Sequence, residues 1–270
     1  MDSIRQAVDL ARASHEQSSA TGTFLQSPVA PAASAILDPQ IKEFELSLAH
    51  LESMRIVMHE TADNHGRCFD MLRTQILQEM DKNSWHFLAV SSPTAGCGKS
   101  VTACNLAMSI ARLPERSVLL VDMDLQKPKV AEYLGIPRKT GLLSVVDGRA
   151  SLASQVVHAH LGRIKLLVLP GEACKSGSSE WMASQKMTTI LHTMKRDFRS
   201  TIVIFDMPPI LVGDDAISIL PRMDAVLLIA AVGNTSIADI RESQKHLKVT
   251  PVVRVVINKV TDKTDSYYGF

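Results

Sequence analysis

The chain of 270 residues lacks a long apolar run. Nothing in it approaches the roughly twenty uninterrupted apolar residues that a helix needs to cross a membrane. Its N-terminus also lacks the apolar core of a secretion signal. We therefore expect a soluble, cytoplasmic protein rather than an integral membrane protein. If it acts at the inner face of the plasma membrane, a partner must recruit it there.

The sequence also lacks an excess of charge and an ordered cysteine pattern. It has 29 Lys and Arg against 28 Asp and Glu, a formal net charge of +1. This balance gives no global attraction to nucleic acid, so no nucleic-acid partner is expected. The four cysteines, Cys68, Cys97, Cys104 and Cys174, have no metal-ligand spacing and are expected to be free thiols in a reducing compartment.

Composition divides the chain into four parts. Residues 1–17 place Ile4 and Val8 on one face of a short amphipathic helix. Residues 18–38 are rich in Ser, Thr, Ala and Pro and form a flexible linker. Residues 39–260 carry the apolar content of a folded domain, including helices that precede its sheet. Residues 261–270 form a mobile tail with two tyrosines, Tyr267 and Tyr268.

The clearest motif is a phosphate-binding loop between an apolar run and an alanine-rich helical pattern. Backbone N–H groups of such a loop and the start of the next helix surround a polyphosphate. Lys99 supplies a charge for the β and γ phosphates, and the Ser100 hydroxyl suits Mg²⁺. Pro93 stands where the usual pattern has glycine. The predicted nucleotide-binding residues here are Thr94, Ala95, Gly96, Cys97, Gly98, Lys99, Ser100 and Val101.

Acidic residues end two further apolar runs. Asp122 and Asp124 leave one run together, and their paired negative charge requires a cation or hydrogen bonds. A bound Mg²⁺ is one explanation; alternatively, Asp122 caps the next helix and Asp124 is a surface residue. Asp206, followed by two prolines, ends the other run and resembles a Walker B element that holds Mg²⁺ directly or through water.

Alternation of apolar runs with helical patterns predicts an α/β fold. The expected architecture is a doubly wound, mostly parallel sheet of the P-loop NTPase type, with helices on both faces. Strands are expected at residues 86–91, 118–121, 164–169, 202–205, 225–231 and 252–257. Helices are expected at residues 39–60, 67–80, 101–113, 179–198, 215–220 and 237–248.

Together these motifs resemble the cytoplasmic bacterial tyrosine kinases of polysaccharide biosynthesis, a branch of the MinD and ParA group of ATPases. The resemblance rests on the phosphate loop, the Asp122-x-Asp124 and Asp206-x-Pro-Pro elements and the tyrosine tail, and it extends from about residue 56 to the C-terminus. MinD and ParA proteins carry a signature lysine where this chain has Thr94, which favours the tyrosine-kinase branch.

The resemblance implies a function and its cofactors. The chain would be an ATP-dependent and Mg²⁺-dependent protein-tyrosine autokinase that regulates exopolysaccharide or capsule polymerisation and export. It would phosphorylate Tyr267 and Tyr268 in trans within a homo-oligomer. Its partners would be a membrane-bound co-polymerase or activator and a cognate tyrosine phosphatase.

The resemblance also implies residue roles. Lys99 and Ser100 bind ATP and Mg²⁺, Asp122 helps to activate the tyrosine hydroxyl, and Asp124 and Asp206 organise the metal. The metal ligands would be Ser100, Asp122 and Asp206. Asn258 is a candidate for contacting adenine; alternatively, it is a turn residue at the end of a strand.

Two departures from the family pattern leave alternatives open. Gln126 replaces an arginine, and the positive charge moves to Lys127. In the helix before the core, the family pattern Glu-x-x-Arg-x-x-Arg is matched by Arg67, Asp70 and Arg73. The charge signs at Arg67 and Asp70 are exchanged, so that ion pairing between subunits is either preserved or lost. One alternative is therefore an ATP-binding regulatory adaptor with weak or no kinase activity. A partitioning ATPase is a less favoured one.

Overall fold

The computed structural model describes residues 42–57, 64–137 and 140–260, without the side chains of residues 64 and 65. All of these residues lie within one unit of the chain, Ala33–Phe270. The predictions for residues 1–17, 18–38 and 261–270, including Tyr267 and Tyr268, lie outside the described residues. No helix in the described part is long and apolar enough to span a membrane.

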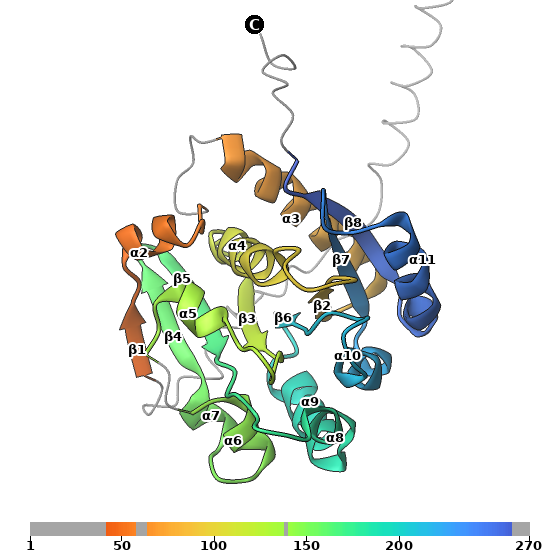
Figure 1. The fold of residues 1–270 in the computed structure, drawn as a ribbon. Helices are drawn as coiled ribbons and strands as arrows, with labels where there is room; N and C mark the ends of the chain where they lie inside the picture. Colours follow the sequence, from red (N-terminus) through yellow and green to blue (C-terminus); the bar gives the residue numbers. More distant parts are fainter. Residues whose placement is uncertain (1–41, 58–63, 138–139, 261–270) are drawn as a thin grey trace, which may run out of the picture. The chain divides into compact units, whose positions relative to one another are not determined.

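An eight-stranded sheet forms the centre of the fold, in the order β1-β4-β5-β3-β6-β2-β7-β8 (Figure 1). The six strands from β5 to β8 in this order are parallel, whereas β4 pairs with β5 antiparallel and with β1 parallel. The strands are β1 (Lys42–Glu45), β2 (Phe87–Ser91), β3 (Ser117–Asp122), β4 (Val157–Leu161), β5 (Ile164–Leu169), β6 (Thr201–Asp206), β7 (Ala225–Ala231) and β8 (Val252–Asn258). The predicted mostly parallel, doubly wound sheet is confirmed.

Helices cover both faces of this sheet, and each face has its own apolar core. One core packs against α2 (Leu48–Ser53), α3 (Asn64–Asn83), α4 (Lys99–Ala111) and α5 (Val130–Leu134). The other core packs against α6 (Leu142–Val146), α8 (Ser178–Ala183), α9 (Gln185–Asp197) and α10 (Asp215–Ile219). Two further helices are α7 (Leu152–Gln155) and α11 (Ile237–His246). Because β2, β6 and β7 are buried on both faces, their residues are apolar except at the ends, where Ser91, Thr201 and Asp206 lie.

Two predictions about individual elements were wrong, and one strand was not predicted. Residues 39–60 were expected to form one helix, but they contain strand β1 followed by helix α2, which Ser47 caps. Strand β4 was not predicted, because its alternating histidines are only partly buried. The helix expected at 179–198 is broken in two, since Ser184 adopts an extended backbone and caps α9.

Helix α3 is tied to α4 by a polar cluster centred on Asp70. The Asp70 carboxylate accepts hydrogen bonds from Arg73 (2.9 Å), from the Ser109 hydroxyl (2.8 Å) and from Arg112 (3.3 Å). Arg73 also donates to the Ser109 carbonyl at 3.0 Å. Two of the charges that were considered for contacts between subunits are therefore paired within the chain.

Candidate active site

The three strands that carry the motifs lie side by side, in the order β3-β6-β2. In the sheet register Asp122 pairs with Asp206, and Asp206 pairs with Val90 just before the phosphate loop. The carboxyl ends of parallel strands meet at one edge of a sheet, where ligands bind in this architecture. Residues separated by more than a hundred positions are thus brought to one place.

The phosphate loop runs from the end of β2 to the start of α4, which begins at Lys99. Gly98 precedes the helix with φ of +91°, a left-handed conformation that favours glycine. A Cβ atom at this position would lie 2.3 Å from Asn258 Nδ2. The loop therefore needs glycine at residue 98 for its conformation and for its close packing.

Two asparagine side chains support this loop from other strands. Asn234, after β7, donates through Nδ2 to the Ala95 carbonyl at 2.8 Å. Asn258, at the end of β8, donates to the Cys97 carbonyl at 2.9 Å. In a trans peptide the N–H points opposite to the C=O, so fixing these carbonyls also fixes the amides of Gly96 and Gly98. The structure places Asn258 against the loop backbone, and its predicted contact with adenine stays a prediction.

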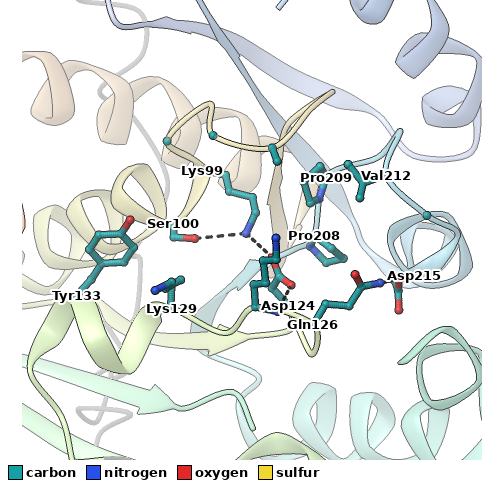
Figure 2. A pocket seen from close by; sticks show the side chains of 15 residues that line it. Lys99, Ser100, Asp124, Gln126, Lys129, Tyr133, Pro208, Pro209, Val212 and Asp215 are labelled. Carbon is teal, nitrogen blue, oxygen red and sulfur yellow. Dashed lines mark hydrogen bonds and ion pairs between the residues drawn. The ribbon is translucent and has the colours of Figure 1, made fainter. Parts of the chain in front are cut away.

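The Lys99 ammonium lies among carboxylates and a hydroxyl (Figure 2). Its Nζ is 2.9 Å from Asp124 Oδ2 and 3.3 Å from Ser100 Oγ. It also lies 3.4 Å from Asp206 Oδ1. Burial alone lowers the pKa of Lys99, but the Asp206 and Asp124 carboxylates outweigh burial and hold this pKa well above its ordinary value. Lys99 is therefore a permanent positive charge at the base of the loop.

Asp206 is fully buried, and its pKa is raised by burial, against the opposing effect of Lys99 and Ser100. Its Oδ2 atom is buried and has no hydrogen-bond partner among the described residues. An orphaned carboxylate oxygen near the Ser100 hydroxyl is a donor set that suits Mg²⁺. Within the described residues no three His, Cys, Asp or Glu side chains form a metal site by themselves, so phosphate and water oxygens would complete the coordination.

Asp122 is buried and held by backbone amides. Its Oδ1 accepts from Asp124 N at 3.2 Å, and its Oδ2 accepts from Val130 N at 3.0 Å. Burial and the Asp206 charge raise the pKa of Asp122 to about 8, although these amides and Lys99 oppose the rise. Asp122 thus organises the loop that joins β3 to α5.

A pocket opens beside this cluster, and Figure 2 shows the side chains that form it. The phosphate loop, the loop after β3 and the loop after β6 form its walls. Lys99, Ser100 and Asp124 line it, whereas Asp122, Asp206 and Asn258 are not among its lining residues. The lining residues are Ala95, Gly96, Gly98, Lys99, Ser100, Asp124, Gln126, Lys127, Lys129, Tyr133, Pro208, Pro209, Val212, Gly213 and Asp215.

The remaining loop residues of the prediction lie around this centre. Thr94 and Cys97 contact each other and the Asn234 side chain. Hydrogen bonds from Thr235, Thr94 and Asn234 outweigh burial and lower the pKa of the Cys97 thiol. Val101 lies in the first turn of α4 and packs against the apolar core. All four cysteines are free thiols, as predicted.

Sequence reasoning missed three residues of the site. Gln126, noted only as a departure, donates to Asp215 at 2.7 Å and to Ser178 at 3.3 Å, and so connects the loops after β3, β5 and β6. Tyr133, on α5, lines the pocket. Asn234 follows an apolar strand at the same sheet edge as the aspartates, and that position was a signal that could have identified it.

Comparison with known proteins assigns this arrangement to a family. Residues 88–268 match the family described as the CobQ/CobB/MinD/ParA nucleotide binding domain. The chain belongs to this family. The match begins in β2 and includes the phosphate loop and all three aspartates. Membership in the CobQ/CobB/MinD/ParA family agrees with the wider group that the motifs resemble.

Individual relatives in this family include tyrosine kinases. EpsB of Ralstonia nicotianae is 32% identical over 206 residues, which cover 74% of this chain and 26% of EpsB. The tyrosine-protein kinase CpsD of Streptococcus pneumoniae is 27% identical over 188 residues, which cover 68% of this chain and 81% of CpsD. The chain thus spans about a quarter of EpsB but most of CpsD.

The fold is shared with a solved kinase domain. The kinase domain of the Escherichia coli tyrosine kinase ETK superposes with a TM-score of 0.68 at 23% identity, covering 77% of this chain and 81% of that domain. At this level of identity the likeness establishes the fold.

Proposed function

We propose that the protein is an ATP-dependent protein-tyrosine autokinase that phosphorylates Tyr267 and Tyr268 of another copy and regulates exopolysaccharide or capsule polymerisation and export. The observation that carries the proposal is the meeting of Lys99, Asp124 and Asp206 beneath the phosphate loop. The similarity to CpsD and the tyrosine tail support a tyrosine acceptor.

The residues of the site suit phosphoryl transfer, which depends mainly on positioning and charge neutralisation. The loop amides and Lys99 would bind the β and γ phosphates of ATP. Ser100 and Asp206, with Asp122, would hold Mg²⁺, which when bound neutralises charge on the phosphates. The phenolic oxygen of tyrosine would form the new bond to the γ phosphorus as the bond to ADP breaks.

Asp122 is the proposed acceptor of the tyrosine proton. A tyrosine hydroxyl has a pKa near 10, so phosphoryl transfer to it benefits from a nearby carboxylate that accepts the proton. Asp124, whose Oδ1 accepts from Lys127 N at 2.9 Å, would keep the metal site and Lys99 in place.

The proposed partners follow from the same assignment. A membrane-bound co-polymerase or activator would recruit the protein to the inner face of the plasma membrane, a tyrosine phosphatase would reverse the modification, and a homo-oligomer would bring each tail to a neighbouring site. The resemblance of the motifs to the tyrosine kinases of polysaccharide biosynthesis supports these partners. Their identity requires a direct interaction measurement.

The experiment is a phosphotyrosine map. The protein is incubated with ATP, Mg²⁺ and the cytoplasmic segment of the activator, and phosphate is located by mass spectrometry. We expect phosphate on Tyr267 and Tyr268 of the wild type and none on Lys99→Met. Absence of tyrosine phosphate from the wild type under these conditions would refute the kinase proposal.

A regulatory adaptor is a second candidate, which the neutral Gln126 beside Asp215 favours. An arginine offers a charged, two-pronged donor, whereas the Gln126 amide leaves Asp215 Oδ1 without a partner in the described residues. The adaptor predicts that Lys99→Met abolishes polymer regulation, whereas the Tyr267→Phe, Tyr268→Phe double variant retains it. The kinase predicts that both variants lose it.

A further inference from the structure

Exposed aliphatic side chains are concentrated in the last part of the described chain. Of the ten large hydrophobic residues that are exposed among the described residues, seven lie between residues 232 and 260. Single exposed apolar side chains need no explanation, but a concentration of them marks an interaction surface. These seven residues, called here the edge patch, are Val232, Ile237, Val249, Val252, Val255, Ile257 and Val260.

Most of the edge patch lies on or directly beside β8, the strand at one border of the sheet. β8 is the last strand in the sheet order, so one of its sides has no strand beside it among the described residues. Val255 and Ile257 are two residues apart on this strand and share one face. The amide of Val232 donates to the Asn258 carbonyl at 3.0 Å, which places Val232 beside the end of β8. Figure 1 shows α11 beside β8.

Helix α11 leaves this surface largely uncovered. Ser243 is the one buried residue of α11, and Ile237 at its first turn is 71% exposed. A helix that buries so little contributes its side chains to the surface instead of to the core. The edge patch therefore extends from β8 onto the start of α11.

The charge around the edge patch is positive. Residues 232–260 contain five basic and two acidic side chains, although the whole chain has a net charge of only +1. Both acidic residues are engaged locally: Asp239 caps α11 through Ser236, and Glu242 pairs with Lys245 at 2.6 Å. Within the described residues no ion pair involves the other four basic side chains. These are Arg241, Lys248, Arg254 and Lys259.

We propose that the edge patch binds the surface of an anionic lipid bilayer. Aliphatic side chains surrounded by Lys and Arg enter the headgroup region while the cations contact acidic lipid. Each basic residue near such a surface contributes attraction that depends on salt. Protein interfaces are enriched in aromatic anchors, and the edge patch has none.

The location of the edge patch gives this binding a consequence. Asn258, the residue after Ile257 on β8, supports the phosphate loop by donating to the Cys97 carbonyl. Residues 261–270 continue directly from Val260. Lipid binding would therefore place the nucleotide site and the start of the tail at the membrane. The inference goes beyond the proposed kinase function and does not depend on it.

Vesicle sedimentation of the full chain without nucleotide tests the proposal. We expect at least about tenfold stronger binding to phosphatidylcholine vesicles that contain about one third phosphatidylglycerol than to pure phosphatidylcholine, with loss of binding in high salt. The double variant Val255→Asp, Ile257→Asp should reduce binding at least about fivefold. Met71→Asp, at a 60% exposed methionine of α3, is the matched control and should bind normally.

Two controls exclude other causes of a change in vesicle binding. Repeating the comparison in a chain with Ile4→Asp and Val8→Asp separates the edge patch from residues 1–17. Circular dichroism shows whether each variant is folded. The proposal is overturned if the folded double variant binds like Met71→Asp. It is also overturned if sedimentation velocity shows a dimer that the double variant abolishes while anionic vesicles bind neither protein.

Discussion

At the scale of single residues, the site combines one cation with three buried or nearly buried carboxylates. Lys99 pairs with Asp124 and Asp206, and Asp122 is held by backbone amides. Buried charges are stable only when they are paired or hydrogen bonded. The cluster is therefore built around the positive charge of Lys99 and one unsatisfied oxygen of Asp206.

Gly98 gives the first prediction. Gly98→Ala adds a Cβ atom 2.3 Å from Asn258 Nδ2 and strains a backbone with φ of +91°, so the loop must move. We expect ATP affinity to fall by about a hundredfold or more, measured by isothermal titration calorimetry. Gly148→Ala is the matched control, because Gly148 has φ of +82° but open space around it. Equal ATP affinity in the two variants would show that the Gly98 contact is unimportant.

Asp122 gives a pH prediction. Its pKa is about 8 when folded, against about 3.9 in an unfolded chain. Between these values the folded protein holds a proton that the unfolded chain has lost, so the free energy of unfolding decreases as pH rises from about 4 to about 8. Asp122→Asn removes this titration. Between about pH 5 and about pH 8, the free energy of unfolding of the variant should therefore rise relative to that of the wild type, by up to a few kcal/mol.

Urea unfolding of nucleotide-free and metal-free protein at both pH values measures this change. Asp197→Asn, at an exposed carboxylate beside Arg196, is the control and should show little relative change. A stability difference between Asp122→Asn and the wild type that stays constant across the window would contradict the assignment of a raised pKa.

At the scale of elements, the Asp70 cluster joins α3 to α4, the helix that follows the phosphate loop. Asp70→Asn removes a charge that accepts from Arg73, Ser109 and Arg112. Because the carboxylate is 33% exposed, solvent screens part of its effect, and we expect a loss of about 1 kcal/mol in the free energy of unfolding.

Asp81→Asn is the matched control for that measurement by urea unfolding. Asp81 also lies on α3 and pairs with Arg116, but both side chains are more than a third exposed. Its loss should change stability by at most about half a kcal/mol. Equal losses in the two variants would mean that the Asp70 cluster is no more than a surface ion pair.

Strands were predictable from sequence where burial on both faces gives a continuous run of apolar residues. Strands β2, β3, β6 and β7 are apolar on both faces and were located from their sequence runs. The short strands β1 and β4, at and near the sheet edge, were not predicted from sequence. Both are partly exposed, and they pair with each other in the sheet. Propensity alone therefore gave a helix where the sheet required a strand.

The residues of the candidate site were likewise predictable where a local motif marks them and not where a contact between distant loops does. The residues of contiguous motifs, Lys99, Asp122 and Asp206, were predicted and lie together in the structure. Contacts between distant loops were not predictable, since nothing local in the sequence links Gln126 to Asp215 or Asn234 to Ala95. Such contacts depend on the strand order, which a single sequence does not specify.

At the scale of the whole molecule, the edge patch and the tail adjoin each other in sequence. Phosphate on Tyr267 and Tyr268 would add about three to four negative charges, and these tyrosines follow in sequence a segment with an excess of three positive side chains, residues 232–260. We expect phosphorylated protein to bind anionic vesicles more weakly than unphosphorylated protein, by about tenfold in vesicle sedimentation. The Tyr267→Phe, Tyr268→Phe variant, treated with ATP in the same way, should keep its binding.

The central claim is that the Lys99 site transfers phosphate to the tail of another copy, and a mixing experiment tests it most directly. Lys99→Met supplies an intact tail, and Tyr267→Phe, Tyr268→Phe supplies an intact site. With ATP, Mg²⁺ and the activator segment, mass spectrometry should find phosphate on Tyr267 and Tyr268 of the Lys99→Met chain only when the two variants are mixed. No phosphotyrosine in the mixture, or equal phosphate on Lys99→Met alone, would contradict the claim.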